Sequence, residues 1–278
     1  MVATMDFYRQ QSPLTDPGEL SPLFDGLPRD VGALAEVVRG GILHRDETTW
    51  RFGFEVSREH EDEPQTRYAQ EILRLMGSWN GRELPDRFVG TCRDFAMLLC
   101  SMLRHIGVPA RLRVGFGGYF VKDFFDDHWV VEYWTDEHGW RLADAQVAGD
   151  ARAAYGVGFD VMDVPRDQFV VGGAAWIACR AGEADPDAFG VHGAGLKGMW
   201  EIQGSVIRDL ASLNRVETLP WDNWGLIPRE YQDLGDADVA LLDEAAQVSA
   251  AGGPLERAVA LYEAHPILQA PPHLATRS

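Results

Sequence analysis

Residues 89–107, VGTCRDFAMLLCSMLRHIG, decide how this chain is organised. Large apolar side chains recur there at the three- and four-residue spacing that lines one face of a helix. Thr91 is a suitable N-cap, Asp94 three places later fits a capping box, and Gly107 is a typical stop. We therefore predict a helix that begins at Cys92 and buries one face in a core.

The pattern changes after this helix. Residues 110–121, 127–134 and 139–144 alternate apolar and polar side chains and are rich in Val, Phe, Tyr and Trp, which is typical of strands. Residues 135–138 fit a hairpin turn between the last two of them. One helix followed by a block of antiparallel strands indicates an α+β fold rather than alternating α/β units.

Weaker patterns lie on both sides of this region. Helical spacing predicts further helices over residues 31–38, 65–79, 199–213, 237–249 and 254–264, with Asn80 and Gly81 ending the second of them. We expect three segments along the chain: a lead-in over 1–64, a catalytic core over 65–180, and a C-terminal helical extension packed on the core over 181–278.

Charge and composition exclude several classes of protein. The 25 Lys and Arg residues face 43 Asp and Glu residues, a net charge of -18, which repels nucleic acid and anionic membrane surfaces. Three cysteines make no disulfide framework, and no apolar run reaches the roughly 18 residues that span a bilayer.

The chain shows no CxxC or HExxH motif, so we predict no metal and no cofactor. Because no secretory signal opens the chain, we expect a cytoplasmic protein, whose oligomeric state stays open.

Cys92 is the strongest candidate for chemistry. The partial positive charge at a helix N-terminus favours a thiolate, which raises the nucleophilicity of a cysteine at neutral pH. Backbone N–H groups of the same turn can receive the oxyanion of a tetrahedral intermediate. Buried structural thiols are common, and Cys100 and Cys179 fit that role better. Cys100 lies in mid-helix among apolar neighbours, and Cys179 has no base nearby in the sequence.

A nucleophilic thiol needs a base, and the base needs a group that orients it. His128 opens one predicted strand and Asp144 closes the next. In an antiparallel hairpin the start of one strand lies beside the end of the following one. We therefore predict that this imidazole and this carboxylate are neighbours, with the second ring nitrogen facing the thiol. The strand register on which the prediction depends is left open by the sequence.

These segments together resemble the transglutaminase-like superfamily, with its papain-like Cys-His-Asp core. GTCRDFAMLLCSMLRHIGVPARLRVGF is similar to the cysteine segment of that family, HWVVEYW to its histidine strand, and GWRLADAQ to its aspartate strand. The resemblance spans about residues 65–147. It implies a catalytic helix packed on an antiparallel sheet, with extra helices at both ends of the chain. It also implies Cys92 as nucleophile, His128 as general base and acid, and Asp144 as orienting carboxylate.

The family further implies an oxyanion donor upstream of the cysteine, for which Trp79 and Asn80 are candidates. The function expected from the resemblance is acyl transfer from a peptide, amide or thioester through an acyl-thioester. Water would make the enzyme an amidase or peptidase, and an amine would make it a transglutaminase-type acyltransferase. Two alternatives stay open: a thiol-dependent condensing or cyclising enzyme of a biosynthetic pathway, and a non-catalytic binding module on the same scaffold.

Overall fold

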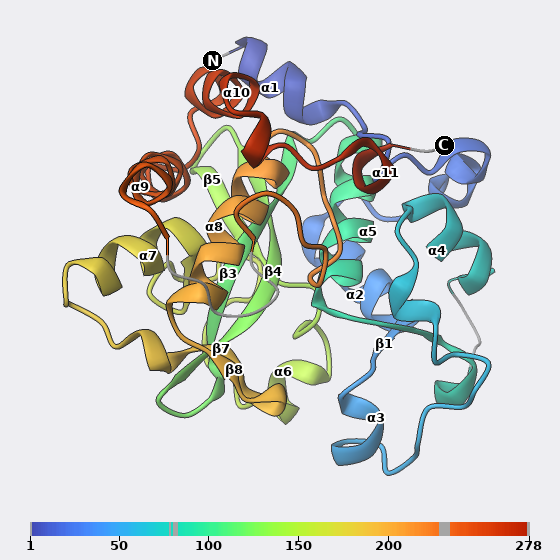
Figure 1. The fold of residues 1–278 in the computed structure, drawn as a ribbon. Coiled ribbons are helices and arrows are strands. Elements are labelled where there is room, and N and C mark those ends of the chain that lie inside the picture. Colours follow the sequence, from blue (N-terminus) through green and yellow to red (C-terminus); the bar gives the residue numbers. More distant parts are fainter. Residues whose placement is uncertain (1, 78, 80–82, 228–233, 277–278) are drawn as a thin grey trace. The chain divides into compact units, whose positions relative to one another are not determined.

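The computed structural model describes residues 2–77, 79, 83–227 and 234–276 and divides the chain into two compact units (Figure 1). Unit 1 comprises Met1–Arg111 and Val130–Val164, and unit 2 comprises Leu112–Trp129 and Pro165–Ser278. The chain passes from one unit to the other inside two strands, β3 (Ala110–Val121) and β4 (Phe124–Thr135). Helices and strands do not alternate regularly, which confirms the predicted α+β class.

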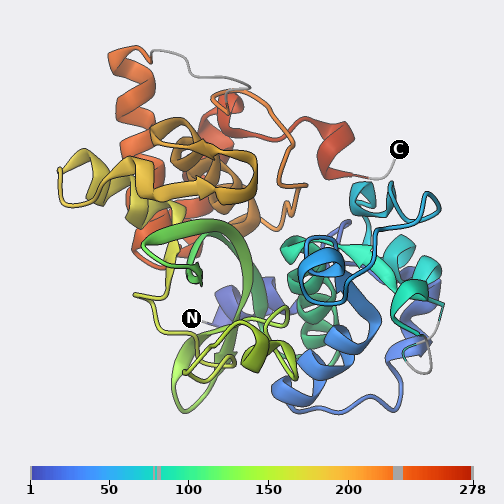
Figure 2. The same cartoon turned by 90° about the horizontal axis from the view of Figure 1, so that it is seen from below.

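Unit 1 is built mainly of short helices. Its elements besides the start of β3 and the end of β4 are α1 (Val2–Arg9), η1 (Gly18–Phe24), α2 (Val31–Gly41), β1 (Ile42–His44), α3 (Glu47–Trp50), η2 (Glu63–Gln65), α4 (Ala69–Met76), η3 (Leu84–Asp86), β2 (Phe88–Gly90), α5 (Cys92–His105), β5 (Gly139–Ala143) and α6 (Ala151–Ala154). The helices α1, α2 and α4 and the strands β1 and β2 pack on α5. The blue and cyan segments gather around this helix in the view from below (Figure 2).

Helix α5 begins at Cys92, as the sequence predicts, and Gly107 follows its end at a φ of 84°. The capping box is present, because the Thr91 backbone N–H donates to Asp94 Oδ2 at 2.8 Å. The sequence predicts that this helix buries one face, whereas its side chains from Cys92 to Arg104 are all buried. Polar residues on α5 therefore need partners from other segments.

The segment predicted as a lead-in supplies some of those partners. Ser101 Oγ donates to the Thr15 carbonyl at 2.7 Å, and Arg104 Nη1 donates to Thr15 Oγ1 at 2.8 Å. The Gln11 side chain in turn donates to the Ser101 carbonyl at 2.8 Å. Residues before 64 are thus an integral part of unit 1. The division into 1–64, 65–180 and 181–278 stays a prediction, while the compact units divide the chain elsewhere.

The helix predicted over 65–79 is shorter than expected. α4 begins at Ala69, after the 3-10 turn η2, and ends at Met76. Gly77 follows with a φ of 65°, a conformation that favours glycine, so it terminates the helix before the predicted stop. Asn80 and Gly81 lie outside the described residues. The other predicted helices are confirmed, and α2 continues through Gly41.

Unit 2 combines strands with the C-terminal helices. Its elements besides most of β3 and the start of β4 are β6 (Phe169–Val171), α7 (Gly172–Arg180), η4 (Pro186–Ala188), β7 (Phe189–Val191), η5 (His192–Ala194), β8 (Leu196–Lys197), α8 (Met199–Leu213), α9 (Asp236–Ala250), α10 (Leu255–Ala264), η6 (Pro266–Leu268) and α11 (Pro272–Ala275). Within this unit α8 contacts α7, α9 and α10, and Figure 1 shows α8 in orange close to α9 and α10 in red.

Strand pairing is mixed rather than wholly antiparallel. In unit 1, β4 and β5 pair antiparallel with Val131 opposite Ala143 and Thr135 opposite Gly139, which confirms the predicted hairpin. In unit 2, β3 pairs antiparallel with β6, whereas β4 pairs in parallel with β7 at Phe125 and Phe189. β1 and β2 form a separate parallel pair in unit 1.

The core of unit 2 is apolar and tightly packed around α8, whose Ile202, Val206 and Leu210 are fully buried. Gly172 begins α7 where a Cβ would lie 2.6 Å from the Ser205 backbone carbon, so only glycine allows the two helices to approach this closely. No helix among the described residues is both long enough and apolar enough to cross a bilayer.

Candidate active site

Cys92 is the first residue of α5, in unit 1, and retains 8% of its exposure. The turn that holds it is fixed by a buried ion pair, because Arg93 Nη1 lies 3.1 Å from Asp94 Oδ1 and both side chains are fully buried. Burial raises the pKa of the Asp94 carboxyl, and the Arg93 charge opposes that shift. Arg93 Nη2 also donates to the Arg67 carbonyl at 2.6 Å, so the chain before α4 holds the same turn.

The two other thiols lie away from the start of α5. Cys100 is fully buried within α5. Cys179 is partly exposed on α7, and burial, with the negative charge of Asp185, raises the pKa of its thiol to about 11. A thiol with that pKa is almost wholly protonated at neutral pH and is a poor nucleophile.

His128 lies on the part of β4 that belongs to unit 2 and is 2% exposed. Aromatic rings enclose its imidazole. The Phe120 ring is 4.7 Å away between centroids, that of Tyr119 is 5.8 Å away and that of Phe169 is 6.2 Å away. Such packing restricts the rotation of the imidazole and limits the access of water to it.

Asp127, which precedes His128 on β4, has an unusually high pKa for a carboxyl group. Burial raises the pKa of Asp127 to about 7, although the positive charge of Arg208 opposes the shift. Ser205 Oγ on α8 lies 3.5 Å from Asp127 Oδ1, and burial lowers the pKa of Arg208. Because side chains alternate along a strand, Asp127 projects from the face of β4 opposite to that of His128. The sequence shows two acids before a strand, which does not distinguish this group from a solvated one.

Asp144 follows β5 in unit 1 and is 1% exposed. Its backbone N–H donates to the Val161 carbonyl at 2.8 Å, and its Oδ1 accepts the backbone N–H of Gln146 at 2.9 Å. The carboxylate is therefore part of a tight turn that its own chain stabilises.

A buried polar network continues from this turn. The Gln146 side chain hydrogen-bonds the Tyr155 hydroxyl, which donates to Glu47 Oε1 at 3.0 Å. Glu47 is fully buried, and its Oε2 accepts a hydrogen bond from Arg39 and another, of 3.1 Å, from Arg51. Polar side chains so deeply buried persist only when they are paired.

The network also reaches the helix that carries the thiol. The Arg39 guanidinium lies over the Phe95 ring, 5.6 Å from its centroid, and the His44 ring stacks on Phe95 at 6.4 Å. Cys92 and Phe95 are three residues apart on α5 and so share one face of that helix. A series of contacts within unit 1 thus runs from the turn of Asp144 to the face of α5 that bears Cys92.

No sequence motif identifies the residues of this network. Arg39, Glu47 and Tyr155 come from separate short helices or their ends and show no motif. Gln146, in the GWRLADAQ segment, carried the one signal that could have been used, because it stands two places after Asp144.

Of the two candidate oxyanion donors, Trp79 is half-buried in unit 1, and its indole N–H donates to the Leu23 carbonyl at 3.0 Å. Asn80 lies outside the described residues. The identity of the oxyanion donor therefore stays a prediction. So does the convergence of the three catalytic candidates, since Cys92 and Asp144 belong to unit 1 and His128 to unit 2.

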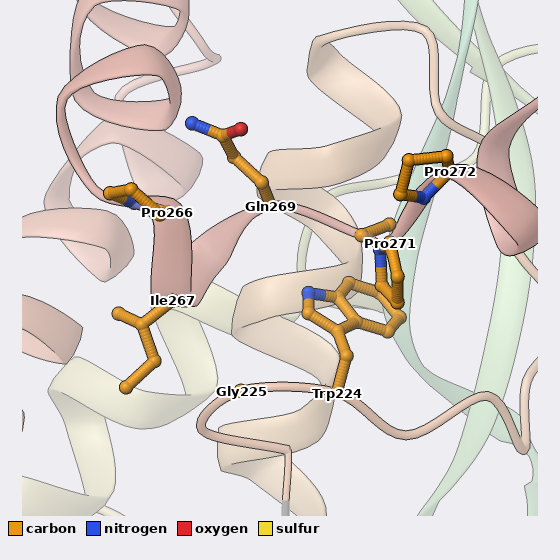
Figure 3. Close-up of a pocket in the computed structure, with 8 residues that line it drawn as sticks. Trp224, Gly225, Pro266, Ile267, Gln269, Pro271 and Pro272 are labelled. Atoms are coloured by element: carbon orange, nitrogen blue, oxygen red, sulfur yellow. The ribbon is translucent and has the colours of Figure 1, made fainter.

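A cavity of about 320 Å³ lies elsewhere in unit 2, beside Trp224 (Figure 3). It is lined by Trp224, Gly225, Pro266, Ile267, Gln269, Ala270, Pro271 and Pro272. The Trp224 indole N–H donates to the Leu268 carbonyl, and the Gln269 amide donates to the Tyr262 carbonyl. The lining holds no nucleophile and no titratable side chain, so it offers no catalytic group.

Comparisons with known proteins agree with the segment that carries the candidates. Residues 61–145 match the model of the Transglutaminase-like superfamily. Over 67 residues the chain is 36% identical to a protein-glutamine gamma-glutamyltransferase of Pseudomonas aeruginosa. The aligned stretch covers 21% of this chain and 10% of that protein. The chain thus spans about a tenth of the length of that curated relative.

A solved structure from Cytophaga hutchinsonii, provisionally described as a cysteine protease, is 17% identical to this chain. The superposition covers 50% of this chain and 40% of the other with a TM-score of 0.34, which is too low to inform the fold. The sequence matches are the ones that carry weight. The resemblance to the transglutaminase-like superfamily is confirmed for residues 61–145, the segment that includes Cys92, His128 and Asp144.

Proposed function

We propose that this chain is a cysteine-dependent acyl-transfer enzyme with Cys92 as nucleophile, His128 as general base and acid, and Asp144 as orienting carboxylate. The observation that carries the proposal is the place of Cys92. It is the first residue of a capped, buried helix, inside the segment that matches the superfamily. A helix start favours the thiolate and presents backbone N–H groups to a developing oxyanion.

In the first half of the reaction the Cys92 sulfur attacks the carbonyl carbon of an amide or thioester. The C–S bond forms while the carbonyl electrons move to oxygen, and the tetrahedral intermediate then collapses with loss of the amine or thiol. His128, which holds the proton taken from the thiol, donates it to that leaving group. The product on the enzyme is an acyl-thioester.

In the second half an acceptor attacks the acyl-thioester. His128 removes a proton from water or an amine, and the Cys92 thiol is restored when the C–S bond breaks. Water gives a carboxylic acid, and an amine gives a new amide. The aromatic rings that enclose His128 favour the exclusion of bulk water, which is a condition for transfer to an amine.

Strand geometry supports the roles of His128 and Asp144. β4 and β5 pair with Val131 opposite Ala143, and Asp144 is the next residue after β5. His128 and Val130 project from the same face of β4, because strand side chains alternate. This antiparallel pairing supports the proposal, which assigns the base to β4 and the orienting carboxylate to the residue after β5.

The test is acylation by p-nitrophenyl acetate, followed by intact-mass spectrometry and peptide mapping. We expect a single acetyl group on Cys92 and, in Cys92→Ala, loss of the acyl-enzyme together with about a thousandfold or greater loss of turnover. Cys179→Ala is the matched control and should behave as wild type, because its thiol is protonated at neutral pH. A folded Cys92→Ala variant with wild-type turnover would end the proposal.

The acceptor can be found in the same assay. Hydroxylamine added during turnover competes with water for the acyl-thioester, and the hydroxamate is measured by mass. A hydroxamate yield that rises to saturation would show an amine subsite and hence an acyltransferase. A yield that follows the bulk ratio of hydroxylamine to water would indicate an amidase or peptidase.

A further inference from the structure

The network beside α5 contains a buried donor without an acceptor. Arg39 is 7% exposed, and its Nη2 pairs with Glu47. Its Nη1 is buried and has no hydrogen-bond partner among the described residues. A buried guanidinium group usually finds acceptors for all its faces, because an unpaired donor costs about 1–3 kcal/mol. The open nitrogen therefore points to an acceptor that the protein does not supply.

Three guanidinium groups gather around the same place, together with the carboxylates of Glu47, Asp150 and Glu83. The guanidinium groups of Arg39 and Arg51 share the Glu47 carboxylate, and both also face Asp150, Arg51 at 2.8 Å and Arg39 through Nε at 3.9 Å. A third guanidinium, that of Arg87, lies within electrostatic range. Burial and then the positive charge of Arg39 lower the pKa of Arg87, while the carboxylates of Asp150 and Glu83 oppose the shift.

This like-charge crowding is notable in a chain whose net charge is -18. An anion would relieve the repulsion between Arg39 and Arg87 and would satisfy the open nitrogen at once. Arginine pairs best with planar, two-oxygen groups, and among these the carboxylate matches its fork.

The position of this cluster connects it to the reacting sulfur. The Arg39 guanidinium lies over Phe95, one helical turn from Cys92 on the same face of α5. β1 pairs with β2 so that His44, which follows α2, lies opposite Gly90, two residues before Cys92. α2 and β1 therefore hold the arginine beside the first turn of α5.

We propose that Arg39, with Arg51 and Arg87 around it, forms a subsite that binds a carboxylate of the acyl substrate whose carbonyl Cys92 attacks. The inference rests on the proposed function and extends it to a substrate class: acyl donors that carry a free carboxylate within a few bonds of the reacting carbonyl. The overall negative charge repels such substrates at long range, so the subsite selects them by contact and not by steering.

The experiment compares two reagents of similar size that alkylate Cys92. 3-Maleimidopropionate carries a carboxylate on a short arm, and N-ethylmaleimide is its neutral counterpart. Rate constants for Cys92 are measured by peptide mass spectrometry at constant ionic strength and on the pH plateau, so that a change in thiolate fraction cancels in the ratio. Glutathione gives the ratio for a free thiol.

We expect the ratio of anionic to neutral rate constants at Cys92 to exceed that of glutathione about fivefold or more, which is typical of one charge pair near a protein surface. Arg39→Gln should bring the ratio down to that of glutathione, and Arg39→Lys should keep part of the difference. Arg45→Gln is the matched control, because it removes one positive charge from the same segment at a half-exposed side chain. It should leave the ratio unchanged.

A second measurement uses the wild-type protein alone, so it does not depend on the folding of a variant. Sodium propionate should slow the reaction with 3-maleimidopropionate in a saturable way, and propionamide should not. Equal ratios for Cys92 and glutathione, together with no effect of propionate, would overturn the subsite while leaving the nucleophile intact. Slow reaction of Cys92 with N-ethylmaleimide, no faster than Cys179, would overturn the proposed function and the subsite together.

Discussion

Two buried arginines on strand β3 stand two residues apart, and they stabilise the two units in different ways. Arg111 in unit 1 pairs with Glu132, 21 residues away on β4, through Nε at 2.9 Å and Nη2 at 2.7 Å. Arg113 in unit 2 pairs with Asp209, 96 residues away on α8, at 2.9 and 2.8 Å. One pair joins neighbouring strands of a hairpin, and the other joins a strand to a distant helix.

The surroundings of the two pairs differ as well. Both contacts of Arg111 end on Oε2 of Glu132, and its guanidinium also lies over the Trp140 ring at 4.2 Å. Asp209 uses both carboxylate oxygens. Oδ1 accepts from Arg113 Nε and from the Val114 N–H, and Oδ2 accepts from Arg113 Nη2 and from Ser249 Oγ. Asp209 is therefore a junction of β3, α8 and α9. We expect unit 2 to depend more strongly on Asp209 than unit 1 depends on Glu132.

The largest effect is expected for Asp209→Asn. The NH2 group of the amide must point toward two of the groups that now donate hydrogen bonds to the carboxylate. The substitution also leaves the buried Arg113 charge unpaired. We expect a loss of about 4 kcal/mol in the free energy of unfolding. Urea denaturation measures it, and hydrogen exchange should show the loss of protection in α7, α8 and α9 and not in α5.

The control is the double variant Arg113→Met/Asp209→Leu, which removes both charges. Since replacement of a whole buried pair by apolar groups is often close to neutral, it should recover more than half of the lost stability. A double variant as unstable as Asp209→Asn would show that packing, and not the unpaired charge, explains the loss.

A smaller effect is expected for Glu132→Gln. The amide oxygen can take the place of Oε2, so the variant keeps both contacts of Arg111, which also retains its contact with Trp140. We expect a loss of about 2 kcal/mol, from the charge alone. The exchange of amides in β5 and β4 reports it. A loss equal to that of Asp209→Asn would remove the difference between the two pairs.

The same difference explains how far the sequence predicts the structure. The start of α5, its cap at Thr91 and its stop at Gly107 are encoded within a few residues, and all three are confirmed. The predicted end of α4 was wrong, because the apolar spacing continues to Trp79 although Gly77 ends the helix. The pair of Arg113 with Asp209 has no periodic or local signal, since its partners are 96 residues apart.

The residues of the candidate site likewise fall into those that a local motif predicts and those that only tertiary packing brings in. Cys92 and the strands of His128 and Asp144 are recognisable because each lies in a contiguous motif. Arg39, which contacts the face of α5 beside the thiol, comes from a helix 53 positions earlier, and its role depends on the packing of α2 on α5. Contacts of that kind arise from tertiary structure, so a single sequence does not contain a pattern for them.

A third acid, Asp127, also belongs to unit 2, but none of the described arginines forms a close ion pair with it. Burial raises the pKa of Asp127 to about 7, whereas an unfolded chain has a carboxyl pKa near 3.9. Between about pH 4 and pH 7 the folded protein keeps a proton that the unfolded chain has released. Stability therefore falls as the pH rises through this window and levels off above about 7.

Asp127→Asn should remove that fall. Because the residue as a whole is only half-buried, solvent reduces the effect, and we expect the variant to gain about 1–2 kcal/mol over wild type between pH 4.5 and pH 8. Urea midpoints at the two pH values measure the gain. The charges that face the group are those of Arg208, Glu201, Asp126 and His128, and none of them is changed in the variant. Parallel pH profiles for the two proteins would contradict the assignment.

The smallest effect is expected for an ion pair in unit 2 that is not buried. Lys197 Nζ lies 3.4 Å from Asp187 Oδ2, and the side chains are 50% and 63% exposed. Water and salt screen such a pair, and holding the long side chain costs entropy, so Lys197→Ala should change the free energy of unfolding by about 0.3 kcal/mol or less. A double-mutant cycle with Asp187→Ala measures the coupling directly. If that coupling approached the effect of Asp209→Asn, burial would not be what distinguishes the junction at Asp209, because charge pairing alone would then stabilise both places equally.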